Sequence, residues 1–215
     1  MRNSRLAACL VSCLLACMTA QARDWTPMSR ERALEQTRSA QPDERRLAYG
    51  RLAEIGTMDD VPVLLAALSD EDALIRGVAE QSVWGIWMRT DDPVADPLFQ
   101  TGMQMITEDE PRKAVEKFDQ VIELKPGFAE VWNRRGNAWE ALGEEELALA
   151  DYRRSLELNP YEFGAMQSIA DILMSRGEYR KAAEYFRQAL EINPNLTEVA
   201  EILQALEQKL ENDRI

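Results

Sequence analysis

The fold is decided by residues 129–162, AEVWNRRGNAWEALGEEELALADYRRSLELNPYE, because the same spacing of residue types recurs before and after them with a period of 34 residues. A small residue recurs at Gly102, Gly136 and Ala170, and another at Ala114, Ala148 and Ala182. An aromatic residue recurs at Phe118, Tyr152 and Phe186, and a proline at Pro126, Pro160 and Pro194. Self-similarity at a fixed period of this length predicts an array of structural repeats.

Each repeated position has a physical reason. The small residues let the two helices of one repeat approach closely, and the aromatic residues fill the space between neighbouring repeats. The prolines follow each second helix, where a residue without an N–H group ends the helix and begins a turn. We therefore expect helix–turn–helix units at 95–128, 129–162 and 163–196.

This pattern resembles the tetratricopeptide repeat (TPR) family, from residue 95 to about residue 211. The resemblance implies an all-α fold, a right-handed α-solenoid of three repeats. After Pro194, apolar residues at helical spacing on one face predict a C-terminal capping helix within 197–215, since a terminal repeat must cover its neighbour and also face water. Two positions depart from the family: Asp109 replaces a turn glycine and Arg135 replaces a leucine. We expect neither to disrupt the fold.

Residues 44–90 lack the 34-residue period but predict three helices, at 45–55, 59–68 and 73–87. The acidic turn at 70–72, followed by Ile75 and Arg76, resembles a short bacterial HEAT-like repeat. One and a half such units cannot bury their own apolar faces. We therefore expect one continuous solenoid, in which these helices cover the N-terminal edge of the TPR stack and Trp84 and Trp87 lie at the seam.

The first 22 residues are typical of a secretory signal. Arg2 and Arg5 precede the apolar run 6–16, and residues 20–22 form a small-x-small cleavage site. We expect export, most simply to the periplasm. The run is too short to span a bilayer, which needs roughly 20 apolar residues, and no later run is longer. Residues 23–43 are expected to form a short helix or an extended arm.

All three cysteines, Cys9, Cys13 and Cys17, lie in this segment, so cleavage after Ala22 would leave no thiol. Residues 14–17 also resemble a bacterial lipobox, which would make Cys17 a lipidated N-terminus and anchor the protein to a membrane. Both outcomes stay open from the sequence.

The charge and the missing residue types exclude several functions. The chain has 38 acidic and 25 basic residues and a net charge of −13, so nucleic acid is not an expected partner. It contains no histidine, no glycine-rich phosphate loop and no G-x-S-x-G turn. We therefore expect no catalytic residues, no cofactor and no metal site.

The family resemblance implies that the first helices of successive repeats line a concave groove for a peptide. Carried over by position, the groove residues are Phe99, Met103, Ile106, Asn133, Asn137, Glu140, Gln167, Asp171 and Met174. The amide side chains can both donate and accept hydrogen bonds, as the backbone of an extended peptide requires. The apolar side chains can contact apolar anchor residues of the same peptide. In the alternative interpretation, the apolar members pack against the HEAT-like helices and the capping helix.

Some TPR proteins hold a partner's C-terminal carboxylate with a clamp of lysine and arginine. The corresponding positions here are Phe99, Met103, Arg134, Gly164 and Ser168, which do not form such a clamp. The sequence therefore predicts a non-catalytic exported scaffold or adaptor that binds a segment of another protein. The alternative is a structural envelope protein without a groove ligand, including one that associates with itself as a homo-oligomer.

Overall fold

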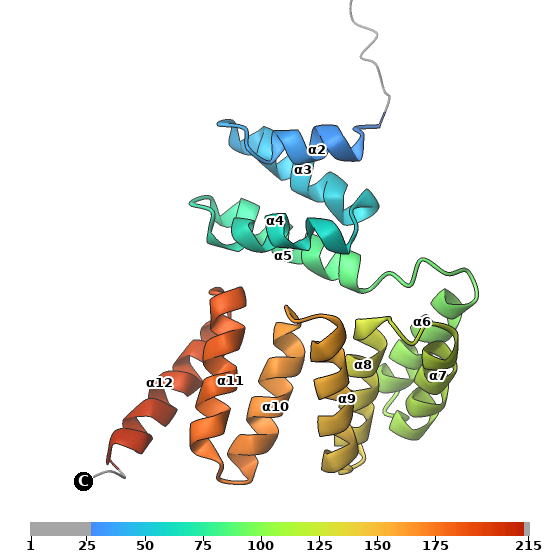
Figure 1. Cartoon of the computed structure of the whole chain (residues 1–215), viewed down its shortest axis with the longest axis vertical. Helices are drawn as coiled ribbons and strands as arrows, with labels where there is room; N and C mark the ends of the chain where they lie inside the picture. The colour runs from blue at the N-terminus through green and yellow to red at the C-terminus, as the bar shows by residue number, and fades with distance from the viewer. Residues whose placement is uncertain (1–26, 213–215) are drawn as a thin grey trace, which may run out of the picture.

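The computed structural model describes residues 27–212, and within this range all regular structure is helical (Figure 1). The predicted signal segment, with the possible lipidation site Cys17, and residues 213–215 lie outside the described residues. No helix between residues 27 and 212 is long and apolar enough to cross a membrane.

Six helices form the three predicted repeats, and a seventh follows them. They are α6 (Ala95–Thr107), α7 (Pro111–Leu124), α8 (Ala129–Ala141), α9 (Glu145–Leu158), α10 (Phe163–Ser175), α11 (Tyr179–Ile192) and α12 (Thr197–Asn212). Helix α12 buries Val199, Leu203 and Leu206 in the same core as α10 and α11. The predicted α-solenoid of three helix–turn–helix repeats with a capping helix is therefore confirmed.

The repeated small residues are required by close helix contacts. A Cβ atom added at Gly136 would lie 2.6 Å from a ring carbon of Tyr152, and one at Gly102 would lie 2.5 Å from a ring carbon of Phe118. The turns inside repeats two and three hold Gly143 and Gly177 at φ of 76° and 73°. Asp109 adopts a similar φ of 59°, so repeat one keeps the turn without its glycine.

Between residues 27 and 94 the structure describes four α-helices, with short 3-10 turns among them. They are α2 (Arg30–Gln36), α3 (Pro42–Ile55), α4 (Val61–Ala66) and α5 (Ala73–Trp87), and the 3-10 turns are η1 (Met58–Asp60) and η2 (Ala67–Ser69). In the predicted acidic turn, Asp70 accepts two hydrogen bonds from Arg45, and Arg76 donates to the Asp70 carbonyl. The three helices expected between residues 44 and 90 are present, with the middle one shortened to α4.

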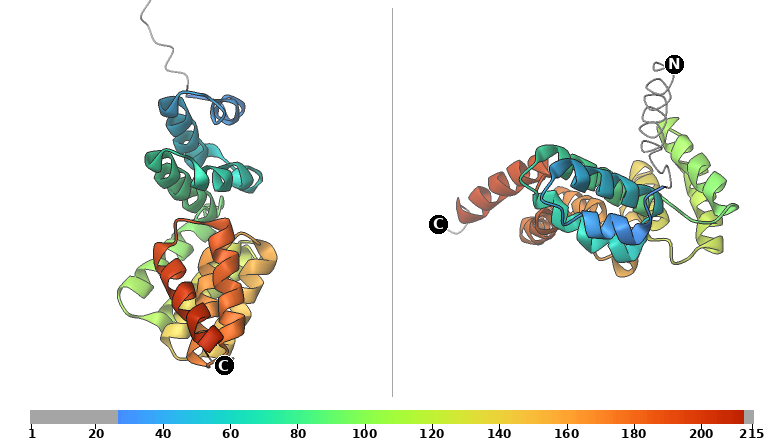
Figure 2. Two further views of the ribbon diagram at one scale, coloured as in Figure 1. Left: turned by 90° about the vertical axis from the view of Figure 1, so that its left-hand side faces the viewer. Right: turned by 90° about the horizontal axis from the view of Figure 1, so that it is seen from above.

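The placement of these helices differs from the prediction. They do not cover the N-terminal edge of the TPR stack but lie across the ends of repeats two and three, as Figures 1 and 2 show from three directions. Their shared core contains Phe163 and Met166 of α10 and Ala189 of α11. The reason is the distribution of apolar surface: Phe99 of repeat one is already covered by Phe118 and Phe128, whereas the ends of α10 and α11 present apolar residues.

Aromatic and amide contacts hold this seam together. The ring centroids of Trp84 and Trp87 lie 5.4 and 5.3 Å from that of Phe163. Asn193 donates a hydrogen bond to Glu80 at 3.0 Å, and Asn195 donates to the Leu68 carbonyl at 2.8 Å. The two tryptophans are therefore seam residues, as predicted, although their partner is repeat three.

Candidate functional site

A hollow on the TPR stack lies between the first helices of repeats two and three. It has a volume of about 480 Å³ and is lined by Asn137, Glu140 and Ala141 of α8 and by Ser168 of α10. These residues offer amide, carboxylate and hydroxyl groups to a ligand. The hollow is therefore suited to polar contacts with an extended chain.

Two lining residues of this hollow contact Tyr152, whose side chain is fully buried beneath them. Its hydroxyl lies 2.8 Å from Asn137 Oδ1 and 2.7 Å from Glu140 Oε2, within hydrogen-bonding distance of both. Because a hydroxyl has one hydrogen to donate, these oxygens share a single donor. Burial raises the pKa of Tyr152 well above its usual range, with a further contribution from Glu140, so the phenol keeps that proton.

Asp171 stands beside the hollow, one turn along α10 from Ser168, and acidic groups surround it. Burial, Glu140 and Glu198 together raise the pKa of the Asp171 carboxyl from 3.8 to about 6. The charged groups that perturb it are both acidic. This surface therefore favours cationic over anionic groups of a ligand.

The structure brings only part of the predicted groove to the surface. Asn137 and Glu140 line the hollow, and Gln167 and Asp171 are half-buried beside it on α10. Met103 and Ile106 are half-buried against the core of repeat one, and Met174 is half-buried against the core that includes the capping helix.

Two of the predicted groove residues are inside the protein, which corrects their expected position. Phe99 is fully buried, because Phe118 and Phe128 pack on it with ring centroids 5.9 and 5.1 Å away. Asn133 is 3% exposed, and its amide nitrogen lies next to Gly164, 3.7 Å from where a Cβ atom would stand there. Neither side chain is available to a peptide in the groove.

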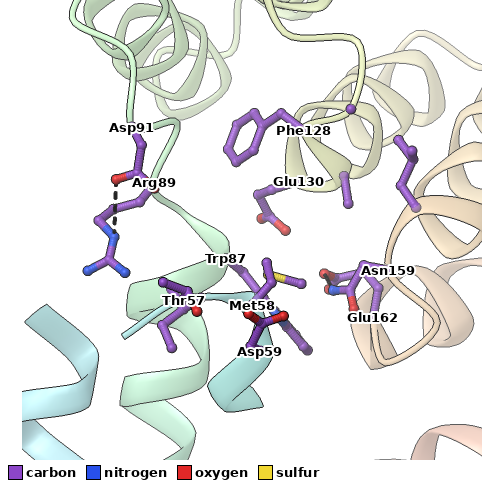
Figure 3. A pocket seen from close by; sticks show the side chains of 14 residues that line it. Thr57, Met58, Asp59, Trp87, Arg89, Asp91, Phe128, Glu130, Asn159 and Glu162 are labelled. Carbon is purple, nitrogen blue, oxygen red and sulfur yellow. Dashed lines mark hydrogen bonds and ion pairs between the residues drawn. The ribbon is translucent and has the colours of Figure 1, made fainter. Parts of the chain in front are cut away.

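A second cavity, of about 400 Å³, lies at the seam between the N-terminal helices and the TPR stack (Figure 3). Its floor contains the buried side chains of Trp87, Glu130, Asn159 and Glu162. Its outer residues include Met58, Asp59 and Asp91, which are exposed, and Phe128, which is half-buried. The cavity thus has an open polar rim above a buried acidic and aromatic floor.

The floor holds two carboxyl groups with incomplete hydrogen bonding. Glu130 accepts a bond of 2.6 Å from Arg134, and Glu162 accepts one of 3.1 Å from Asn159. Glu130 Oε2, Glu162 Oε1 and Trp87 Nε1 have no partner, although a buried polar atom normally has one. Burial and the neighbouring Glu130 carboxylate raise the pKa of Glu162 well above its usual range.

The sequence contained a signal for this cluster that the repeat analysis did not use. Glu162 stands one period from Phe128 and from Leu196, so an acidic residue interrupts an apolar position of the repeat. Ser168 of the hollow was assigned only as a clamp position, and Tyr152 only as a packing residue. Their polar roles follow from three-dimensional contacts that a repeat pattern does not encode.

Comparisons with known proteins identify the repeats. A family model described as "Tetratricopeptide repeat" matches residues 129–162 and 165–196. A TPR repeat-containing protein of Rhizobium etli is 28% identical over 128 residues, which cover 60% of this chain and 63% of that protein. The general transcriptional corepressor trfA of Dictyostelium discoideum is 36% identical over 69 residues, covering 32% of this chain and 5% of that protein.

Two solved structures share the fold of the repeat region. The Sgt2 TPR domain from Aspergillus fumigatus has a TM-score of 0.52 and 21% identity, covering 57% of this chain and 83% of that one. The first TPR of Spaghetti (RPAP3), bound to the HSP90 peptide SRMEEVD, has a TM-score of 0.51 and 19% identity. The match covers 54% of this chain and 92% of that one. The chain therefore contains tetratricopeptide repeats, and the HEAT-like resemblance of its N-terminal helices stays a prediction.

Proposed function

We propose that the tetratricopeptide repeats of this protein act as a non-catalytic scaffold, which binds an extended segment of a partner protein in the hollow between α8 and α10. The observation that carries the proposal is the polar lining of that hollow, in which Asn137 and Glu140 are both held by the Tyr152 hydroxyl. Asn137 and Ser168 can pair with peptide backbone groups, and Tyr152 holds Asn137 in place. A prearranged site loses less conformational entropy when a ligand binds.

The proposed segment carries basic and neutral residues. Glu140 and Asp171 present carboxylates, and a ligand with its own carboxylates would be repelled by them. The solved RPAP3 structure holds a peptide that contains three acidic residues, SRMEEVD, so a TPR surface can accept a short linear ligand. The acidic surface here favours the opposite charge.

Binding of designed peptides to the purified full chain tests this proposal. Two extended peptides of equal length, one rich in lysine and asparagine and one rich in glutamate and asparagine, would be compared by fluorescence anisotropy. We expect the basic peptide to bind and the acidic peptide not to bind. The variant Glu140→Gln should bind the basic peptide about tenfold more weakly. A hydrogen bond to a charged group contributes about 1.4 kcal/mol or more, which corresponds to that factor.

A control variant separates the hollow from general charge effects. Glu157 is an exposed carboxylate on the second helix of repeat two, outside the hollow, so Glu157→Gln has the same net charge as Glu140→Gln. It should leave peptide binding unchanged apart from a weak, salt-sensitive loss. Equal losses in the two variants would contradict the assignment of the hollow.

We also propose that the protein is exported, because its first 22 residues have the charge and apolar run of a secretory signal. The mass of the intact protein isolated from cells distinguishes the outcomes. Cleavage after Ala22 gives a mature chain that starts at Arg23, and lipidation gives a chain that starts at a modified Cys17. An unprocessed chain in the cytosol would contradict export.

A further inference from the structure

The cavity at the seam is separate from the proposed peptide hollow, and its chemistry is unusual. Two carboxyl groups, Glu130 and Glu162, are 1% and 0% exposed and lie on its floor. Arg134 balances only one of them directly, through its bond to Glu130. In Figure 3 the carboxyl groups of Glu130 and Glu162 both point into the cavity.

A second positive charge, besides Arg134, is needed to balance this pair. Two neighbouring buried carboxylates cannot both be ionised without such compensation. The minimal solution is one proton held by the pair, because burial and the neighbouring Glu130 carboxylate raise the pKa of Glu162. That proton accounts for the unpaired carboxyl oxygens but leaves the indole N–H of Trp87 and the cavity itself unexplained.

We propose that the seam cavity binds a primary ammonium group on an aliphatic stem, which replaces the proton held by Glu130 and Glu162. The ammonium group donates to Glu130 Oε2 and Glu162 Oε1, the two floor oxygens without a partner. Phe128 on the cavity wall offers an aromatic side chain to the stem and to the cation. Asp59 and Asp91 on the exposed rim attract a cation from solution.

The other charged groups around the cavity do not already supply that cation. The guanidinium of Arg89 donates to the backbone oxygens of Ala53, Glu54 and Gly56 and pairs with Asp91, and in Figure 3 it points away from the carboxyl pair. Within residues 27–212, no group of three or more acidic, histidine or cysteine side chains is arranged to hold a metal ion. An organic cation therefore fits this floor better than a metal ion does.

The exchange is balanced in charge. One proton leaves the carboxyl pair for solvent as one ammonium group enters, so the net charge of the floor does not change. The charged groups that face the pair are Arg134 on α8, Arg89 and Asp91 after α5, and Asp59 on η1. None of them needs to change its protonation state in this exchange. Binding should therefore release about one proton per ammonium group at neutral pH.

Calorimetric titration of the purified full chain tests the proposal with two probes. One is 1,5-diaminopentane, a free amine, and the other is N-acetyl-lysine N-methylamide, which stands for a lysine side chain of a partner. We expect saturable binding, with a heat that differs between buffers of different ionisation enthalpy because a proton is released. Binding of the lysine probe would indicate a protein partner, and binding of the diamine alone would indicate a small-molecule ligand.

Two variants check the assignment. Glu162→Gln keeps the shape of the side chain and can still donate to Glu130, so we expect an unchanged circular dichroism spectrum and binding weaker by at least about tenfold. Asp59→Asn lies on the exposed rim, cannot disturb the core, and should weaken binding by about threefold. As a control, Glu157→Gln, at an exposed position that lines neither the seam cavity nor the hollow, should leave amine binding unchanged.

The result that would overturn the proposal is clear. If neither probe gives more heat than the neutral analogue N-acetyl-(N-ε-acetyl)-lysine N-methylamide, the proton alone completes the pair. Binding without proton release, or equal binding by Glu162→Gln, would also exclude the exchange. Because a lysine side chain of the basic peptide suits either site, the variants distinguish the two: Glu140→Gln weakens binding at the hollow, and Glu162→Gln weakens binding at the seam.

Discussion

Substitution of Gly136 by alanine tests the packing of the repeats most directly. The added Cβ would lie 2.6 Å from Tyr152 Cε1 and 2.8 Å from Cδ1. The ring cannot easily move aside, because it is fully buried and its hydroxyl contacts Asn137 and Glu140. Helices α8 and α9 must therefore separate, or the contacts of Tyr152 must break.

The size of the effect follows from two opposing contributions. In an exposed helix interior, alanine is more stable than glycine by about 1 kcal/mol. The substitution Gly77→Ala in α5 measures this contribution alone, since a Cβ atom at Gly77 would have no neighbour within 4 Å. At Gly136 the same gain is opposed by overpacking, at about 1–3 kcal/mol, and by a strained hydrogen bond to a carboxylate, at about 1.5–3 kcal/mol. Because both variants share the propensity gain, the two opposing contributions add, and we expect Gly136→Ala to be about 2.5–6 kcal/mol less stable than Gly77→Ala.

Urea unfolding followed by circular dichroism at 222 nm measures both variants under one condition. Gly77→Ala should unfold at a higher urea concentration than the natural protein, and Gly136→Ala at a lower one. Gly136→Ala should also weaken binding of the basic peptide, because Tyr152 holds Asn137 and Glu140, which line the hollow. If Gly136→Ala matched or exceeded Gly77→Ala in stability, the close approach of α8 and α9 would be refuted.

Three further predictions concern polar contacts. Arg135→Leu, which restores the usual family residue, should destabilise the protein by about 3 kcal/mol in urea unfolding, because the buried Asp151 carboxylate loses its bidentate partner at 2.7 Å. The pKa of Asp171 is raised from 3.8 to about 6, so the folded protein binds this proton more tightly than the unfolded chain does. The stability gained in this way is fully present below pH 3.8 and is lost as the pH rises through about 6. Asp171→Asn should remove that part of the pH dependence of the unfolding midpoint. Asn195→Ala should cost about 1 kcal/mol, as the seam loses the 2.8 Å bond to the Leu68 carbonyl.

The first of these predictions has a matched control. Arg154 pairs with Glu157 at 2.7 Å, but the two side chains are 44% and 64% exposed, so Arg154→Leu should change stability by less than about 1 kcal/mol. Comparable losses at Arg135 and Arg154 would show that burial of Asp151 is unimportant. A pH dependence that persists in Asp171→Asn would assign it to other carboxyl groups. An unchanged midpoint in Asn195→Ala would show that the seam does not depend on this bond.

The local part of the fold could be predicted because it is periodic. The helices and turns of the repeats follow from small, aromatic and proline residues at a fixed spacing, and even Asp109 keeps its turn. The docking of the N-terminal helices could not be predicted, since an apolar face in the sequence does not say which other apolar face it meets. The burial of Asn133 follows from that docking, because Asn133 lies on the side of α8 that faces the seam cluster rather than the hollow.

The position of Glu162 bears on whether the seam serves packing alone. Apolar residues occupy the aligned positions of the neighbouring repeats, at Phe128 and Leu196, so the fold accepts an apolar side chain there. A buried carboxyl beside another carboxyl costs free energy, and apolar replacement of buried charges is often neutral or stabilising. Packing therefore does not explain Glu162, whereas a ligand that needs a negative charge at the floor of the cavity does. Glu162→Leu should accordingly be at least as stable as the natural protein while it fails to bind the ammonium probes.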